Sequence, residues 1–221
     1  MAKASERAIA EALLKRHGRT FADELHIPVE ENTPSALFRL LCASLLFSAR
    51  IQADIATRAA RALADQGWNT PEKMAASTWG ERTRTLNEAG YARYDGITSR
   101  MLGDTTQLLL DRYAGDLDNL REEAERKPDR ERQLLKGFKG IGDVGADIFF
   151  REVQVAWDEL FPFADQRALK GARKLGLTDD PKALAELVGD RDFPRLVAAL
   201  IRVQLEGDHE EVLEEARRSE A

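Results

Sequence analysis

The chain has 221 residues, a net charge of −6, 43% hydrophobic residues and 33% charged residues. This composition provides enough apolar residues for a substantial core under a well-solvated surface. No apolar run approaches the roughly 20 residues that a membrane-spanning helix needs, and the first residues lack the apolar core of a signal peptide. We therefore expect a cytoplasmic protein.

The negative charge is concentrated at the C-terminus. Residues 206–221 carry seven acidic and two basic side chains, a net of −5, which leaves −1 for the rest of the chain. The overall charge is therefore a weak argument against a polyanionic partner, although no strongly basic segment argues for one. The sequence leaves open whether the acidic segment shields a binding surface, binds a partner or only adds solubility.

Helix signals recur along the N-terminal half of the chain, and strand signals do not. An amphipathic helix is predicted at the N-terminus. Thr33-Pro34 is an N-cap followed by proline at the first helical position, and the helix that it opens, SALFRLLCASLLFS, is apolar on nearly all sides. Such a helix belongs in the centre of a bundle. Further helices are predicted over residues 52–66, after Thr70-Pro71, and from Thr78 to a stop at Gly90.

The C-terminal half has the same character. Residues 98–113 form another predicted helix with apolar residues on one face, and the polar stretch 121–132 follows it. Asp180-Pro181 and Pro194 open two more helices near the C-terminus. We predict about ten helices, no internal repeat and no long linker. The expected fold class is all-α.

The sequence argues against a metal centre. Cys42 is the only cysteine, whereas an iron–sulfur cluster takes about four. It lies inside the apolar helix that Thr33-Pro34 opens, where a small buried hydrophobic residue is the better interpretation. The three histidines are scattered without ligand spacing, so we predict no metal site.

The most informative segment is residues 134–150, LLKGFKGIGDVGADIFF. In the Gly140-Ile141-Gly142 turn, the glycines let the backbone bend sharply and approach a ligand without interference from a Cβ atom, while the isoleucine is expected to be buried. Amides at the start of the next helix then face outward, where the helix dipole favours an anion, and Lys136 and Lys139 add positive charge. The alternatives are a purely structural helix–helix turn and a hairpin that contacts a protein.

This segment resembles the helix-hairpin-helix motif of the endonuclease III-like DNA glycosylases, whose hairpin reads apolar-x-Gly-apolar-Gly and continues into a helix of small residues. The resemblance implies a monomer that binds double-stranded DNA, has no contact with membranes and is associated with the nucleoid. The DNA-binding residues that it implies in this segment are Lys136, Lys139, Gly140, Gly142 and Gly145. Asp143 counts against a phosphate ligand because its carboxylate would repel one, although an acid there also caps free amides.

The resemblance further implies a two-lobed helix-hairpin-helix fold. A helical barrel is expected over residues 33–153, and a second lobe is expected to combine residues 1–32 with residues 154–221. DNA would lie across the groove between the lobes. The four-cysteine iron–sulfur cluster of the family is absent, as it is in some branches, so no cofactor is expected apart from a monovalent cation that the hairpin could hold.

In the resembling family, an aspartate follows the hairpin and an apolar stretch, at the mouth of the cleft. Asp165, after Leu160-Phe161-Pro162-Phe163-Ala164, fits this pattern, and we predict it as the catalytic residue. Breaking an N-glycosidic bond builds positive charge on the deoxyribose, which a carboxylate stabilises while it orients or deprotonates the attacking water. The plain alternative is a helix N-cap. Gln166-Arg167 departs from the Thr-His pair that often follows this aspartate.

Bifunctional members of the family carry a nucleophilic lysine two residues after the second glycine of the turn. Val144 stands at that position here, and valine cannot form a Schiff base. The prediction is a monofunctional enzyme with little or no lyase activity. Lys136, Lys139 and Lys170 could replace the lysine, but each is better explained as a phosphate contact or a solvated surface residue.

Two further residues take positions that contact DNA in the resembling family. Arg50 stands at the end of the apolar helix, where a glutamine commonly fills the gap left by the flipped base. Ordinary surface charge explains Arg50 equally well. Tyr91 lies in the Gly90–Tyr94 segment, in the place of a loop that wedges the duplex, where an aromatic ring could unstack bases. Core packing of Tyr91 is an equal alternative.

The leading hypothesis is a DNA repair hydrolase that excises a flipped, damaged or mismatched base. The rival is a non-catalytic DNA-binding or damage-sensing protein that keeps the hairpin without the chemistry. A third interpretation is a helical scaffold with a protein partner, in which the glycine turn is structural. The sequence does not identify the excised base.

Overall fold

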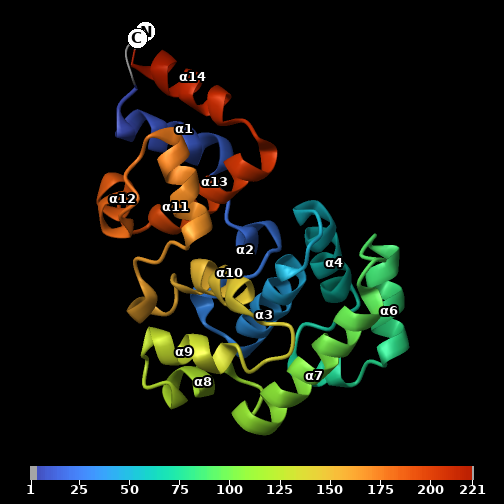
Figure 1. Cartoon of the computed structure of the whole chain (residues 1–221). Helices are drawn as coiled ribbons and strands as arrows, with labels where there is room; N and C mark the ends of the chain where they lie inside the picture. The colour runs from blue at the N-terminus through green and yellow to red at the C-terminus, as the bar shows by residue number, and fades with distance from the viewer. Residues whose placement is uncertain (1–3, 221) are drawn as a thin grey trace. The chain divides into compact units, whose positions relative to one another are not determined.

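We describe the chain from a computed structural model, which describes residues 4–220. Every regular element within these residues is a helix, which confirms the predicted all-α class. The chain divides into two compact units: Leu25–Glu159, which we call the central unit, and Met1–Glu24 together with Leu160–Ala221, which we call the terminal unit (Figure 1). The predicted lobe boundaries at residues 33 and 153 lie inside the central unit.

The central unit is built around one long apolar helix, α3 (Pro34–Ser48). The Thr33 hydroxyl accepts a hydrogen bond from the Ala36 amide at 3.3 Å, and Pro34 occupies the first turn, as the sequence predicts. Helix α3 packs against helices on several sides, which is why its residues are apolar nearly all round. The elements of the unit, in chain order, are η1 (Val29–Glu31), α3, α4 (Ala53–Asp65), α5 (Pro71–Ala75), α6 (Trp79–Glu88), α7 (Asp95–Tyr113), α8 (Leu117–Glu123), α9 (Pro128–Leu135) and α10 (Asp143–Val153), with η2 (Asp158–Leu160) at its end.

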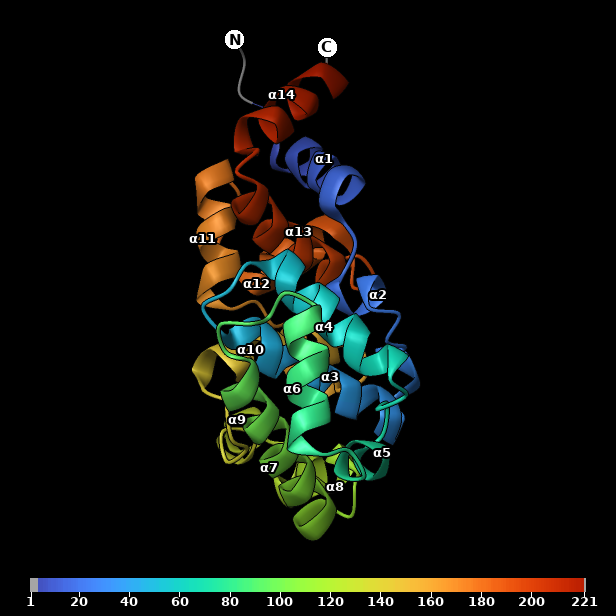
Figure 2. The same ribbon diagram turned by 90° about the vertical axis from the view of Figure 1, so that its right-hand side faces the viewer.

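Two neighbours of α3 position the residues of interest. Helix α10 packs directly on α3, and so does α4. Helix α6 packs against both α4 and α7; Figure 2 looks onto α4 and α6. Thr78 and Glu81 form the predicted capping box at the start of α6, and Gly90 follows its end with a positive φ of 89°.

The terminal unit brings the two ends of the chain together. Its helices are α1 (Glu6–His17), α2 (Phe21–Glu24), α11 (Gln166–Leu175), α12 (Pro181–Val188), α13 (Phe193–Glu206) and α14 (His209–Ser219). Helix α13 packs against α1, α11 and α12, and it supplies much of an apolar cluster to which α1 contributes Ile9 and Leu13.

The acidic C-terminal segment forms helix α14, which lies along α1. Lys15 is paired with Glu215 at 2.5 Å, and Arg16 is paired with Asp208 at 2.6 Å. The His17 ring also contacts Asp208 at 3.0 Å. A considerable part of the negative charge of this segment is thus balanced within the terminal unit.

The structure has more helices than the predicted ten. The additional ones include three short helices: α2 has four residues, and α8 and α9 occupy most of the stretch that the sequence marks as polar. Isolated helices of this length are marginal in water, so tertiary packing rather than local sequence stabilises them. Among the residues that the structure describes, none of the helices is both long enough and apolar enough to cross a membrane.

Candidate nucleic-acid interface

The hairpin between α9 and α10 has the geometry that its glycines predict. Gly140 has a positive φ of 87°, and a Cβ atom there would stand 2.9 Å from the Met101 sulfur and 3.2 Å from Leu45. Ile141 is 3% exposed, and its amide donates to the Phe138 carbonyl at 3.1 Å. Gly140 therefore satisfies both a backbone and a packing requirement, and Ile141 anchors the turn in the core.

Hydrogen bonds fix the hairpin to two helices of the central unit. The Thr105 hydroxyl on α7 donates to the Lys139 carbonyl at 3.0 Å, and the Ser48 hydroxyl at the end of α3 approaches the Gly140 carbonyl at 3.4 Å. Gly145 is buried, and a Cβ atom on it would meet Ile141 at 3.3 Å. Gly145 thus packs against the turn, and its predicted contact with DNA stays a prediction.

The start of α10 presents unpaired amides to solvent. Gly142 occupies the N-cap without any side-chain cap, and it is exposed together with Asp143 and Val144. The first amide of this helix that has a backbone partner is that of Ala146, which donates to the Gly142 carbonyl at 3.0 Å. Within residues 4–220, the amides from Gly142 to Gly145 find no acceptor. The dipole of α10 adds partial positive charge at this point.

Open space surrounds the Cβ position of Gly142. A Cβ atom built on Gly142 has no heavy atom within 4 Å, apart from its own chain neighbours, and the φ of this residue is −98°. Alanine would therefore fit at Gly142 without strain. Glycine here leaves room for an approaching ligand, in contrast to Gly140, which the fold itself requires.

The two lysines near the hairpin were both expected to add positive charge for a ligand, but only one of them lacks a partner among the residues that the structure describes. Lys136 donates to the Asp143 carboxylate at 2.6 Å, and this contact holds the pKa of Asp143 below its usual value. Both side chains remain substantially exposed, so the pair is weak and can open. The side chain of Lys139 is exposed, and it has no partner in the described part of the chain. Lys139 is thus the cation available to a ligand, while Lys136 offsets the repulsion from Asp143.

A shallow surface depression lies in the same unit. It is lined by Arg50, Ile51, Gln52, Ile55, Gly90 and Arg93. Arg50 follows the C-terminus of α3, two residues after Ser48, whose hydroxyl reaches the hairpin. The structure therefore brings the predicted Arg50 and the Gly90–Tyr94 segment together. It also adds Arg93, which sequence reasoning missed; its guanidinium lies 5.2 Å from the centre of the Tyr94 ring.

Tyr91 does not take the predicted wedging role. Its side chain is completely buried, and its hydroxyl donates to the Leu46 carbonyl of α3 at 3.1 Å. Burial also raises the pKa of this phenol. Gly90 adopts a left-handed conformation directly before the buried ring, and the exposed residues of this segment are Gly90, Ala92 and Arg93.

Asp165 belongs to the terminal unit, where it is the N-cap of α11. Its Oδ1 atom accepts a hydrogen bond from the Ala168 amide at 2.8 Å, and the residue is 8% exposed. This geometry is that of a helix N-cap, which is the plain alternative given in the sequence analysis. A catalytic role, and a position opposite the hairpin, stay predictions.

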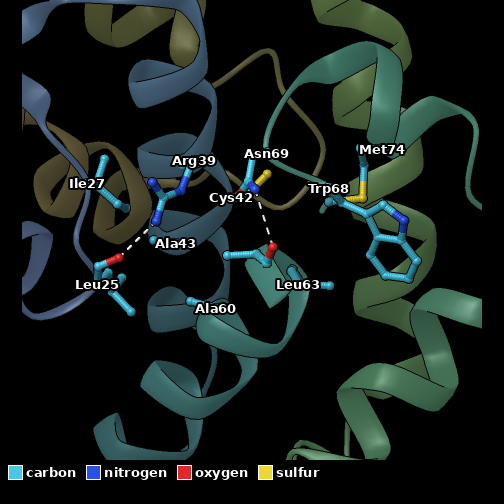
Figure 3. A pocket seen from close by; sticks show the side chains of 11 residues that line it. Leu25, Ile27, Arg39, Cys42, Ala43, Ala60, Leu63, Trp68, Asn69 and Met74 are labelled. Carbon is cyan, nitrogen blue, oxygen red and sulfur yellow. Dashed lines mark hydrogen bonds between the residues drawn. The ribbon is translucent and has the colours of Figure 1, made fainter. Parts of the chain in front are cut away.

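A small cavity elsewhere in the central unit is not a substrate site (Figure 3). It lies beside α3, and its volume of about 20 Å³ leaves room for a single water molecule. Arg39 on one wall donates to the carbonyls of Leu25 and His26, at 2.8 and 3.0 Å. Burial raises the pKa of the Cys42 thiol to about 12, so this cysteine is not a nucleophile at neutral pH. No group of three or more His, Cys, Asp or Glu side chains in the described residues could hold a metal ion.

No family model matches the chain, and no curated protein matches it either. A solved structure described as "Structure of a Trapped Endonuclease III-DNA Covalent Intermediate: Estranged-Adenine Complex" is similar to the chain with a TM-score of 0.49 and 20% sequence identity. The similarity covers 76% of this chain and 73% of that one. The function is therefore proposed from the residues of the site.

Proposed function

We propose that the protein binds double-stranded DNA through the hairpin and excises a base as a monofunctional DNA glycosylase. The observation that carries the DNA-binding part is the set of outward-facing amides at Gly142, Asp143 and Val144, with open space in front of Gly142. Rigidly held amides at a helix N-terminus are suited to a phosphate oxygen. Lys139 contributes a free positive charge beside them, and Arg50 and Arg93 supply further cations in the same unit.

The catalytic part of the proposal assigns the reaction to Asp165. Excision needs a carboxylate that stabilises the developing positive charge on the sugar and activates water. A buried carboxylate whose orientation is fixed by a helix cap is suited to this task because it needs no reorganisation during the reaction. Val144 supports hydrolysis by water rather than by a Schiff base, since the side chain at the lyase position is exposed yet has no nucleophile.

A second candidate is a non-catalytic DNA-binding or damage-sensing protein. The observation that favours it is the hydrogen bond from the Ala168 amide to Asp165, which gives this carboxylate a structural role in any case. In this alternative the hairpin binds phosphate and no bond is broken. A monovalent cation at the hairpin is compatible with both candidates and stays a prediction.

The hairpin is tested with Gly142→Ala, because the added Cβ fits the fold but occupies the space that a phosphate would use. We expect the dissociation constant for a short fluorescein-labelled duplex to rise about tenfold, equivalent to ~1.4 kcal/mol. Lys139→Gln should lower the slope of log affinity against log salt by about 0.9, because one phosphate contact is lost. Fluorescence anisotropy measures both effects.

Gly80→Ala is the matched control for the hairpin variant. Gly80 lies on α6 in the same unit, and its Cβ position is also open. This substitution should leave DNA affinity unchanged. Unaltered affinity in both Gly142→Ala and Lys139→Gln would show that the hairpin is not the contact.

Catalysis is tested with Asp165→Asn on a panel of duplexes that carry damaged or mismatched bases. Asparagine caps helices as well as aspartate does, so α11 should stay folded while the charge is lost. We expect base release to fall at least ~100-fold, and borohydride to trap no covalent protein–DNA adduct with the wild type.

Asp180→Asn controls for the loss of a capping carboxylate, since Asp180 caps α12 in the same unit through the amides of Lys182 and Ala183. Base release that persists in Asp165→Asn would remove this residue from the mechanism. Hairpin-dependent DNA binding without base release by the wild type would instead support the non-catalytic candidate.

A further inference from the structure

Helix α11 carries a concentrated positive charge that the hairpin does not account for. Four basic residues and no acidic residue lie within Gln166–Leu175, although the chain as a whole has a net charge of −6. Three of the basic residues, Arg167, Lys170 and Lys174, follow helical spacing. At 3.6 residues per turn they form one stripe about 10 Å long. The fourth, Arg173, is paired with Asp179 at 2.9 Å.

The opposite face of α11 is packed rigidly into the terminal unit. The buried residues Ala168, Leu169, Gly171, Ala172 and Leu175 lie on the side that faces α13. A Cβ atom on Gly171 would stand 2.5 Å from the Leu200 carbonyl, so the two helices are in close contact. Gln204 on α13 also donates to the Arg167 carbonyl at 2.9 Å. The basic stripe is therefore displayed on a fixed support rather than on a mobile segment.

The side chains of the stripe are exposed and have no partner among residues 4–220. Many other basic residues of the terminal unit pair with carboxylates, for example those on α1, α13 and α14. Helix stability explains only one end of the stripe. Lys174 stands in the last turn of α11, where the helix dipole favours a cation, whereas Arg167 stands in the first turn, where the dipole opposes one.

We propose that this face of α11 is a second contact for duplex DNA, in which Arg167, Lys170 and Lys174 bind phosphates of the backbone. The inference rests on the proposed DNA-binding function and assigns part of the affinity to the terminal unit. Duplex DNA is the partner that the charge pattern fits, because it offers one negative charge per about 1.7 Å of its axis along the whole length of the stripe. The contact recognises no sequence, since phosphates are the same at every base pair.

The test is the triple variant Arg167→Gln, Lys170→Gln and Lys174→Gln in the full chain, with a short fluorescein-labelled duplex as the probe. Glutamine has a helix propensity close to that of lysine and arginine, so α11 should persist. We expect affinity to fall about tenfold or more, and the slope of log affinity against log salt, between about 50 and 200 mM, to decrease by about 2 to 3. Circular dichroism verifies the fold, and each single variant should lower the slope by about 0.9.

The matched control removes the same charge from scattered positions of the same unit, with Lys182→Gln, Arg191→Gln and Arg217→Gln. These three residues lie on α12, in the following loop and on α14. If both triple variants change affinity equally, the effect is one of total charge and the stripe is not a contact. That result would leave the hairpin intact as the binding site, whereas a wild-type protein that binds no duplex would overturn both proposals.

Discussion

Glu131 on α9 has no exposed surface, and its carboxyl oxygens receive no hydrogen bond from a donor in the described residues. Its charged neighbours are Glu159, Arg121 and Arg126. Burial, and then the contact with Glu159, raises the pKa of Glu131 to about 8. Burial acts in the same direction on Glu159, but the contacts with Arg121 and with Glu131 together outweigh burial and hold the pKa of Glu159 at about 2. At neutral pH the two carboxyl groups therefore share one proton, which Glu131 holds.

This proton makes stability fall as the pH rises. In the unfolded chain Glu131 loses its proton near pH 4.5, whereas in the folded protein it keeps the proton up to about pH 8. The folded state binds more protons across this window, so the free energy of unfolding decreases from pH 5 to pH 8 and levels off above it. Glu159 does not change the free energy of unfolding within this window, because above its unfolded pKa it is ionised in both the folded and the unfolded state.

Glu131→Gln should abolish this dependence. The glutamine amide can donate to Glu159 as the protonated acid does, and it never ionises. We expect the variant to match the wild type near pH 5 and to exceed its free energy of unfolding by roughly 3 kcal/mol near pH 8.5. Urea denaturation at a series of pH values measures the difference.

Glu122→Gln on α8 is the control, because Glu122 is exposed and should leave the pH profile of the wild type unchanged. If the free energy of unfolding changed with pH in the same way for the wild type and Glu131→Gln, this result would contradict the assignment of the proton to Glu131.

Among the elements, those with complete local signals could be predicted from the sequence. Thr33-Pro34 caps α3, the capping box starts α6 and Pro194 stands in the first turn of α13, each within the segment expected. The hairpin turn could be predicted for the same reason, because glycine is required where the chain adopts a positive φ. The short helices α8 and α9 could not, since packing rather than propensity forms them.

The site was only partly predictable, because its contacts join residues that belong to different elements. The pairing of Lys136 with Asp143 spans the turn, and no pattern within either helix indicates it. Tyr91 and Arg93 are two residues apart, yet one is buried and the other is exposed. Which of them reaches the surface is decided by the left-handed turn at Gly90 and by the hydrogen bond to Leu46, which only the folded backbone shows.

For the whole molecule, the central unit is continuous in the sequence, whereas the terminal unit is assembled from both ends of the chain. We expect a fragment of residues 25–159 to fold alone, because it retains α3 and the helices packed on it, together with Arg121, Glu131 and Glu159. Circular dichroism of the fragment should show a helical spectrum and a cooperative thermal transition.

The contrasting fragment, residues 160–221, lacks α1 and should show no cooperative transition, since α1 supplies Ile9 and Leu13 to the apolar cluster of that unit. A non-cooperative melt of the 25–159 fragment would mean that the central unit depends on the rest of the chain.

The pairing of α1 with α13 also has a consequence for biosynthesis. Ile9 and Leu13 are synthesised long before the helix that covers them, which begins at Phe193. At the usual elongation rates the intervening residues take roughly 10 to 35 s to synthesise. Throughout that interval the side of α1 that packs on α13 in the folded protein lacks this partner, so Ile9 and Leu13 are exposed on the nascent polypeptide.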